Sequence, residues 1–425
     1  MNECLIDLNT NNSLVDLFDS TNNDYSKEIL KNIFLDNNIS FSSVCDRQNI
    51  LRAMAKNWNS ICEYNYSKHQ YIEVKNFINS VYDFKINNDN VFFKIFKKKN
   101  EIEESRRRSN VIQLITFMNN LHVFIKKNNN INDFPIEFKD EITNSLIFID
   151  KLRLNYYTDI INANKFKISD SDDVINLIFK LGEKEMASFW NFINKLEVYW
   201  SITRSIKKYN LVFPSFKQDQ FIIDDFFHPM IKNPIKNSID LSNCKVMLLN
   251  GPNMSGKSTL LKAVGLCVFL SRIGLAVPAS HCVVPFFDFI AVHINTKDNI
   301  IDGYSHFMLE VKNIKDLIIR INNGQTCFVI FDELFNGTNV DDATDIMKLI
   351  ISGLSRKQGI TSIISTHLLS LEGYNIEKNI GIENGFLDCE INNNIPKFSY
   401  KLVRGWSKLK IGKLLFYNEG IMNLL

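Results

Sequence analysis

Hydrophobic side chains recur every three to four residues through the first 200 positions, which is the spacing of amphipathic helices. Glycine and proline, which interrupt helices, are rare in this stretch. The polar run Ser169–Asp172 is a predicted N-cap. Helices of this length are typical of bundles and lever arms, so we expect residues 1–210 to form an all-α core and lever domain. The pattern predicts helices over residues 26–36, 47–64, 71–84, 106–127, 136–162 and 172–208.

The pattern changes near residue 211. From there, short apolar runs alternate with glycine-containing turns and helical stretches, which is typical of a mostly parallel sheet with helices on both faces. We therefore expect residues 211–425 to form an α/β domain. The predicted strands are residues 245–250, 286–294, 326–331 and 359–365.

Composition indicates a globular protein but does not indicate an activity. Of the 425 residues, 45% are hydrophobic and 23% are charged, which is typical of a folded globular chain. The net charge of +2 argues against a protein that coats nucleic acid through overall basic charge. A net charge of this size is compatible with a basic patch on part of the surface.

The cysteines, the first ten residues and the most apolar run indicate the cellular compartment in which the protein is expected. The 8 cysteines are scattered and none has the spacing of a zinc site, which favours a reducing environment. The first ten residues include Glu3 and Asp7 and no basic residue, unlike a secretory leader. The most apolar window, residues 260–277, is interrupted by Lys262 and Arg272, which favours a buried helix over a membrane span. We expect a cytoplasmic protein without a membrane partner.

A phosphate-binding motif follows the apolar run that ends at Asn250. Its glycines let backbone N–H groups converge on one point, and the following helix adds the positive potential of its N-terminus. Lys257 would contact the β- and γ-phosphates of ATP, and the Ser258 hydroxyl would bind Mg²⁺. This P-loop, G-x-x-x-x-G-K-S, comprises Gly251, Pro252, Asn253, Met254, Ser255, Gly256, Lys257 and Ser258, followed by Thr259.

Two acidic residues end a later apolar run. Residues 327–331 are followed by Asp332 and Glu333, the pattern of a Walker B motif. Asp332 is the expected Mg²⁺ ligand, through water, and Glu333 is the expected general base for the attacking water. The alternative is a simple polar cap at a strand end. His367, which follows the apolar pair Ile363–Ile364, is a candidate γ-phosphate sensor or a structural histidine.

These segments together resemble a known family. The sequences GPNMSGKST (residues 251–259), FDELFNGTNVDDA (residues 331–343) and STH (residues 365–367) resemble the ATPase domain of the MutS DNA mismatch-recognition family. The resemblance implies an ABC-like P-loop NTPase fold that binds ATP and Mg²⁺. It is strong over residues 227–371 and looser before them.

Other matching segments bear on oligomerisation and on the nucleotide pocket. Residues 304–310 resemble the family segment that reaches the nucleotide of the opposite subunit. This implies an in-trans contact from Ser305 and a homodimer with two composite ATP sites. Asp342 matches an acidic residue of the loop after Walker B, and His228–Pro229 and Asn237 resemble the family's entry to the nucleotide site.

The chain also departs from the family pattern. Pro234 stands where the family has an aromatic residue packed on adenine, and Phe335, Asn336 and His306 replace a glycine, an arginine and a threonine. The only Phe-x-Glu triplet, residues 331–333, lies within Walker B, so it does not supply the family's mismatch wedge.

The helical half matches more weakly, at residues 19–30, 46–47 and 196–216. We expect a short form with a reduced clamp, which lacks the family's N-terminal mismatch-recognition domains and its C-terminal dimerisation segment.

One local basic cluster stands out, since residues 91–108 hold seven basic and three acidic side chains. Contact with DNA phosphates is one explanation, and a solvated surface turn is the other. The candidate contacts are Lys97, Lys98, Lys99, Arg106, Arg107 and Arg108.

The leading hypothesis is an ATP-dependent DNA-binding protein of the mismatch-repair type, in which a homodimeric ATPase drives a clamp on double-stranded DNA. The first alternative is a MutS-like ATPase that acts on branched DNA, RNA or ribosomes without recognising mismatches. The second is an interaction module in which bound nucleotide sets a conformation without being hydrolysed.

Overall fold

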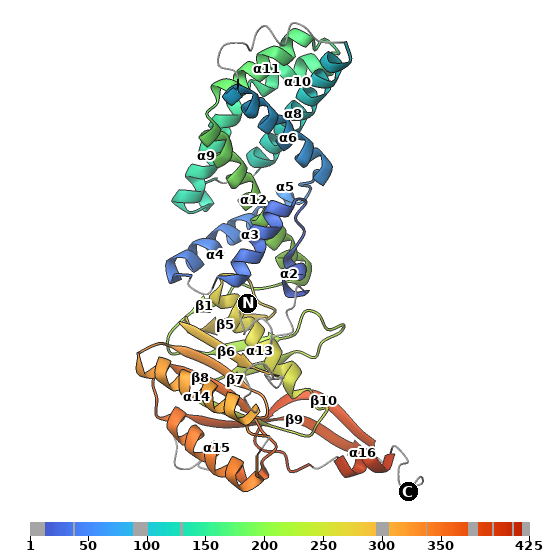
Figure 1. Ribbon diagram of the computed structural model, residues 1–425. Coiled ribbons are helices and arrows are strands. Elements are labelled where there is room, and N and C mark those ends of the chain that lie inside the picture. The colour runs from blue at the N-terminus through green and yellow to red at the C-terminus, as the bar shows by residue number, and fades with distance from the viewer. Residues whose placement is uncertain are drawn as a thin grey trace. The chain divides into compact units, whose positions relative to one another are not determined.

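The structure is a computed structural model, and its chain divides into two compact units that are described separately (Figure 1). One unit contains residues 15–34 and 45–207, and the other contains the described residues among 1–14, 35–44 and 208–425. The sequence boundary at residue 210 had assigned residues 35–44 to the helical part. The described residues are 13–36, 39–87, 101–127, 131–294, 306–336, 338–372, 381–392, 395–409 and 412–418.

The described residues before Leu211 form helices and a short 3-10 turn at Ile131–Asp133, and they contain no strand. None of the helices in the described ranges is long and apolar enough to cross a membrane. The helices are α2 (Ser13–Phe18), α3 (Asp24–Leu35), α4 (Phe41–Lys56), α5 (Trp58–Ile61), α6 (Lys68–Asn87), α8 (Glu101–Lys127), α9 (Ile136–Asp150), α10 (Leu154–Asn162), α11 (Ile168–Lys180) and α12 (Glu183–Tyr209).

Three of the predicted helices are each divided in two. The prediction over residues 136–162 is wrong at residues 151–153, because Arg153 has a left-handed backbone (φ 51°) that a continuous helix does not allow. The prediction over residues 172–208 is wrong at Leu181 and Gly182, because Leu181 is extended with ψ 128°. The helix predicted over residues 47–64 is broken between α4 and α5.

The predicted N-cap at Ser169–Asp172 is also wrong, because α11 begins at Ile168 and contains these residues. The cap instead uses the side chain of Asp170, which accepts a hydrogen bond from the backbone N–H of Lys167 at 2.6 Å. An acidic residue in the first turn is favourable at this end of a helix.

A buried carboxylate lies in the middle of the helical unit. Glu197 of α12 is completely buried and accepts hydrogen bonds from the N–H of Asn22 (2.6 Å), the amide of Asn23 (2.5 Å), the hydroxyl of Ser26 (2.8 Å) and the hydroxyl of Tyr66. Burial raises the pKa of Glu197, and these donors oppose the rise. The network ties the segment that enters α3 to the middle of α12.

The second unit is built on a six-stranded sheet with the strand order β10-β9-β4-β8-β7-β6. All neighbouring strands in it are parallel except β9 and β10, which form an antiparallel hairpin. The mostly parallel sheet expected from the sequence is therefore observed. Its strands are β4 (Val246–Asn250), β6 (Phe289–His293), β7 (Cys327–Phe331), β8 (Ile360–Ser365), β9 (Ile382–Asn392) and β10 (Ile395–Arg404).

Helices pack on this sheet because its central strands are apolar on both faces, as parallel strands usually are. Helices α14 (His306–Asn322) and α15 (Val340–Ser355) share one hydrophobic core with Val246, Leu248, Val329 and Ile364. Helix α13 (Lys257–Arg272) follows the P-loop and contacts β7. The chain continues to α16 (Gly412–Asn418).

The sequence pattern did not predict the shorter strands. A four-stranded sheet has the order β1-β5-β2-β3, and strand β2 pairs antiparallel with both of its neighbours. Its strands are β1 (Ser215–Phe216), β2 (Ile222–Phe226), β3 (Asn237–Asp240) and β5 (His281–Val284). The hairpin of β9 and β10 was also missed, because its residues alternate polar and apolar side chains at the rim rather than forming an apolar run.

Candidate functional site: a P-loop edge with two acids

Three chemically distinctive segments meet at the carboxyl edge of the six-stranded sheet. The P-loop follows β4, the acids Asp332 and Glu333 follow β7, and the Ser-Thr-His segment follows β8. Strand β8 lies between β4 and β7, so the three segments are neighbours at this edge. The structure therefore brings together the P-loop, Walker B and His367 as the sequence predicted.

The P-loop backbone has the unusual conformation that its glycines allow. Gly251 and Gly256 have φ values of 144° and 95°, and Met254 has φ 68°. Ser255 is buried, and its hydroxyl has no hydrogen-bond partner among the described residues. An orphaned hydroxyl inside a loop that ends at the N-terminus of α13 is suited to a phosphate oxygen.

Lys257 is the first residue of α13 and is 5% exposed. Its Nζ donates hydrogen bonds to the carbonyl oxygens of Gly251 (2.9 Å) and Pro252 (3.2 Å) and lies 3.9 Å from Glu333 Oε1. Burial lowers the pKa of Lys257, and the two Walker B carboxylates oppose this change. The lysine thus lies folded against the loop whose ligand it would contact.

A chain of hydroxyls and a carboxylate joins the P-loop to Walker B. The hydroxyl of Ser258 donates to Asp332 Oδ2 at 2.6 Å. The hydroxyl of Ser365 donates to the other oxygen, Oδ1, and accepts the N–H of Glu333 at 2.8 Å. Asp332 is therefore held on both sides, and Ser365 is a member of the site that the sequence did not identify as one.

Glu333 faces the P-loop from the turn after β7. Its Oε1 contacts His367 Nε2, and its Oε2 accepts a hydrogen bond from the side-chain amide of Asn336 at 2.8 Å. The hydrogen bond from His367 is the largest influence that lowers the pKa of Glu333. The carboxylate is therefore ionised at neutral pH, as a proton acceptor must be, while its side chain remains 35% exposed.

The turn after Walker B is fixed by helix α14. Glu310 is buried, and its Oε2 accepts the N–H of Phe335 at 3.1 Å. Phe335 has φ 65°, in the region that glycine prefers, and this bond and burial of the side chain in the core stabilise that conformation. Asp342, expected in the loop after Walker B, lies instead in the first turn of α15, whose N-cap is Asn339.

A mostly apolar pocket of about 270 Å³ adjoins the P-loop. His228 and Asn237, expected at the entry to the nucleotide site, both line it, and so does Pro234. The wall beside the P-loop is Tyr400 of β10, whose ring is so close that a Cβ on Gly256 would lie 3.1 Å from it. The pocket thus has the size and the apolar lining of a site for a flat ring next to phosphates.

Tyr400 reaches this place through an irregularity in the hairpin. The register of β9 and β10 shifts between Phe398 and Leu402, and Tyr400 has φ 56°. The side chain of Asn237 holds the bulge, since it donates to the carbonyl of Tyr400 (3.0 Å) and accepts the N–H of Leu402 (2.8 Å). Sequence reasoning missed Tyr400 because it lies on an unpredicted strand far from the P-loop along the chain.

The segment after β10 is fastened to the base of the P-loop. Asn250 is buried, and its amide donates to the carbonyl of Ser407 at 2.8 Å while its carbonyl oxygen accepts the N–H of Ser407 at 3.0 Å. Asn250 is the last residue of β4 before Gly251. The start of the P-loop and residues near 407 are therefore fixed to each other.

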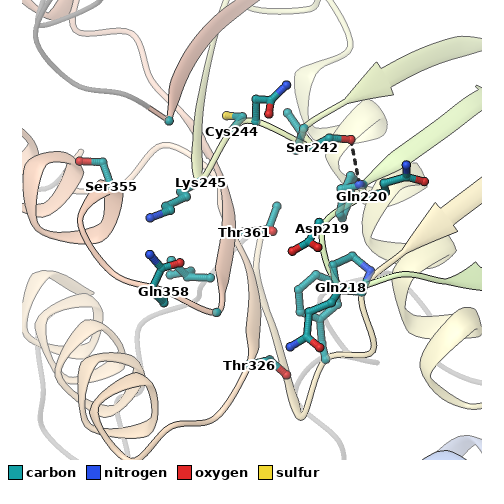
Figure 2. A pocket seen from close by; sticks show the side chains of 18 residues that line it. Gln218, Asp219, Gln220, Ser242, Cys244, Lys245, Thr326, Ser355, Gln358 and Thr361 are labelled. Atoms are coloured by element: carbon teal, nitrogen blue, oxygen red, sulfur yellow. Dashed lines mark hydrogen bonds between the residues drawn. The ribbon is translucent and has the colours of Figure 1, made fainter.

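A larger cavity, of about 730 Å³, lies at the opposite edge of the sheet. Its lining includes Lys245, Thr326 and Gly359, which directly precede β4, β7 and β8. Figure 2 shows Lys245 and Gln358 on one side of it and Gln218 and Asp219 on the other. It contains no P-loop or Walker B residue, so size alone does not identify the nucleotide site.

The remaining predicted site residues either lie outside the described residues or belong to helix α8. Ser305 and Lys97, Lys98 and Lys99 lie outside the described residues. Arg106, Arg107 and Arg108 lie within the first turns of α8 rather than in a turn between helices. Arg107 is mostly buried and its guanidinium lies 3.1 Å from Asp172, which gives it a structural contact within the helical unit.

The donor set at the P-loop edge fits Mg²⁺ bound together with phosphates. Ser258 and Asp332 supply oxygen atoms, and the orphaned hydroxyl of Ser255 lies in the same loop. Among the described residues, no group of three or more His, Cys, Asp or Glu side chains would hold a metal alone. Mg²⁺ usually takes one or two carboxylates and completes its shell with water and phosphate oxygens, which matches this arrangement.

Comparison with known proteins finds similarity in the part of the chain that contains this site. The family described as MutS domain V matches residues 247–414. The DNA mismatch repair protein MutS of Bacillus licheniformis is 31% identical over 199 residues, which are 44% of this chain and 22% of that protein. The corresponding protein of Bacillus thuringiensis is 31% identical over 183 residues, 41% of this chain and 20% of that protein.

The DNA mismatch repair protein Msh3 of Dictyostelium discoideum is 28% identical over 272 residues, which are 58% of this chain and 19% of that protein. The matched segments thus span about a fifth of the length of these relatives. The family match at residues 247–414 includes the P-loop, the Walker B acids and His367. Through residues 247–414, the chain is similar to the ATPase part of the MutS family.

Proposed function

We propose that this protein binds and hydrolyses ATP with Mg²⁺ and couples this reaction to DNA, in a role of the mismatch-repair type. The observation that carries the proposal is the meeting of Lys257, Ser258, Asp332, Glu333 and His367 at one edge of a mostly parallel sheet. The mismatch repair proteins MutS and Msh3 among its relatives support the DNA part of the proposal.

Nucleotide binding would use two adjoining surfaces. The adenine ring would occupy the pocket beside Tyr400, which supplies an aromatic face where the expected position holds Pro234. The phosphates would lie on the P-loop, where Ser255 offers a free hydroxyl and the Lys257 ammonium would exchange its two carbonyl partners for phosphate oxygens. Bound Mg²⁺ supplies charge that offsets that of the phosphates.

Hydrolysis would use the carboxylate of Glu333. This group is ionised, partly exposed, and oriented by His367 and Asn336, so it would accept a proton from the attacking water. His367 contacts this carboxylate, which itself lies 3.9 Å from the ammonium of Lys257, and this placement suits a sensor of the γ-phosphate. Asp332 and Ser258 would hold Mg²⁺.

The proposal extends to a homodimer, in which Ser305 of each chain completes the site of the other. It also extends to contact of the basic cluster with double-stranded DNA. Within that cluster, Arg106 and Arg108 are exposed on α8, whereas Arg107 is engaged with Asp172. A cytoplasmic location completes the proposal and agrees with free cysteines throughout the described residues.

The test is ATP turnover by the full chain, measured alone and with perfect duplex, mismatched duplex, branched DNA and single-stranded RNA. We expect turnover that mismatched duplex stimulates and that Glu333→Gln abolishes. Stimulation by branched DNA or RNA alone would instead support the first alternative function. Nucleotide binding without turnover under every condition would contradict the hydrolysis step and leave a nucleotide-set interaction module.

Concentration tests the dimer. Because a composite site needs two chains, turnover per chain should fall when the protein is diluted below its dimerisation constant. Sedimentation at the same concentrations would show whether the fall coincides with dissociation. Turnover per chain that stays constant across the transition to monomer would contradict in-trans completion of the site.

A further inference from the structure

Ser365 occupies a special place between the two nucleotide motifs. It is the last residue of β8, and its backbone is in register with Leu249 of β4, while the preceding Ile364 is in register with Phe331 of β7. Its side chain is completely buried. The register therefore places its hydroxyl beside the residue that directly follows β7.

The hydroxyl of Ser365 makes two different hydrogen bonds. A serine hydroxyl has one hydrogen to donate and lone pairs to accept. Here the hydrogen goes to Asp332 Oδ1, and the oxygen accepts the backbone N–H of Glu333 at 2.8 Å. One oxygen atom thus fixes the side chain of the first acid and the backbone of the second.

Both acids need such support. The Asp332 carboxylate would rotate if only Ser258 held it, because a single hydrogen bond at Oδ2 leaves the other oxygen free. Glu333 has φ 55°, a left-handed conformation that is unfavourable for a residue with a Cβ. The bond to its N–H acts at this residue, so it helps to keep the side chain of Glu333 directed at the P-loop.

We propose that Ser365 is a positioning residue that sets the Mg²⁺-binding orientation of Asp332 and the base orientation of Glu333. It would act through the two acids, which its hydroxyl contacts directly. This inference rests on the proposed ATPase function, since it concerns the same site. It goes beyond that function because it adds Ser365, on strand β8, to the residues that form the site. Strand β8 would then position both acids of the Walker B motif.

The experiment compares Ser365→Ala with Ser362→Ala. Ser362 is a matched control because it is also completely buried on β8 and its hydroxyl also makes a hydrogen bond, to the carbonyl of Lys245 at 3.0 Å, but it lies three residues before Ser365 and contacts neither acid. Binding of a fluorescent ATP analogue is titrated at increasing Mg²⁺, and hydrolysis is measured at saturating ATP. Thermal unfolding of each variant records the structural cost of losing a buried hydroxyl.

For Ser365→Ala we expect unchanged analogue binding without Mg²⁺, a Mg²⁺ requirement raised about 10- to 100-fold, and a kcat lowered by a similar factor. Ser362→Ala should retain the wild-type Mg²⁺ requirement even if both variants lose similar thermal stability. Ser365→Cys, which keeps a weak donor of similar size, should give an intermediate value.

Two results would overturn the proposal: a Mg²⁺ requirement of Ser365→Ala equal to that of wild type, or an equal increase in Ser362→Ala. Wild-type analogue binding that does not respond to Mg²⁺ would overturn it as well. Failure of the ATPase function is distinguishable, because the binding titration needs no turnover. A wild-type protein that never hydrolyses ATP but shows the Ser365-specific shift supports the positioning role and contradicts only the hydrolysis.

Discussion

Two carboxylates, Glu197 in the helical unit and Glu333 in the sheet unit, are both surrounded by hydrogen-bond donors, yet they suit opposite tasks. Glu197 is completely buried, and four internal donors occupy its oxygens. Glu333 is about one-third exposed, and His367 contacts one of its oxygens while Asn336 donates to the other.

The direction of each pKa shift follows from this difference. Burial dominates at Glu197 and raises its pKa, whereas the bond from His367 dominates at Glu333 and lowers its pKa. A carboxyl with a raised pKa, no exposed surface and four internal donors is not accessible to a ligand, so Glu197 holds helices together. A lowered pKa with an open side leaves an ionised group available for chemistry.

The largest effect should come from Glu333→Gln. Removing the proton acceptor should lower ATP hydrolysis by about 10²–10⁴-fold while ATP binding persists, as measured by turnover and by analogue binding. Because the pKa of Glu333 lies below its ordinary value of 4.5, acid loss of activity through this group should begin only below that pH. Glu383→Gln, at the opposite end of the sheet, makes the same chemical change as a control, and an equal loss there would contradict the assignment.

The next effect should come from Glu197→Ala, which should lower the free energy of unfolding by about 3 kcal/mol, because it orphans several buried donors. Urea unfolding followed by tryptophan fluorescence suits this measurement, since Trp58, Trp190 and Trp200 all lie in the helical unit. ATP hydrolysis per folded molecule should not change in parallel with the loss of stability.

The pH dependence of Glu197 has a definite sign. A carboxyl whose pKa is raised in the folded state binds more protons there than in the unfolded chain, so its contribution makes stability fall as pH rises from 4.5 through the raised pKa. Glu197→Gln should remove this part of the pH dependence. If the difference in the free energy of unfolding between wild type and Glu197→Gln does not change with pH, Glu197 has the same pKa in the folded and unfolded states.

A smaller effect should come from Tyr400→Ala. Loss of an aromatic face beside the base should weaken ATP binding about tenfold, measured by equilibrium titration. Phe398→Ala is the control, because that ring lies on the same strand, 6.0 Å from Tyr400 between centroids, and does not line the pocket. Equal losses in the two variants would indicate damage to the hairpin rather than to base packing.

The smallest effect should come from the paired change Arg106→Ser and Arg108→Ser. Each phosphate contact that is lost should reduce the log–log salt slope of duplex binding by about 0.9. The paired change Lys126→Ser and Lys127→Ser removes the same charge from the other end of α8 and should leave the slope unchanged. Identical slopes in all three proteins would eliminate the DNA contact from this part of the cluster.

The sequence was sufficient for the features that local patterns determine. Apolar runs followed by G-x-x-x-x-G-K-S, by two acids and by a histidine predicted strands β4, β7 and β8 and the residues that follow them. The interruption at Gly182 had a local signal, because glycine often breaks a helix, but the left-handed Arg153 had none.

The features that the sequence did not predict depend on contacts between distant segments. Tyr400 reaches the pocket only because Asn237, 163 positions earlier, holds the bulge of β10. Ser365 belongs to the site only because β8 lies between β4 and β7, which is a matter of strand order rather than of local pattern. No spacing rule within one segment contains that information.

The reciprocal pair of Asn250 and Ser407 closes a ring of chain 157 positions long. Within this ring lie the P-loop, Walker B, His367 and the β9–β10 hairpin, so a ligand that stiffens the ring at one point reduces the motion of the rest. Amide hydrogen exchange in β10 should consequently slow when nucleotide occupies the P-loop. The mobility of the β9–β10 hairpin would then depend on whether nucleotide is bound. A molecule that contacts the hairpin would respond to nucleotide binding without contacting the nucleotide.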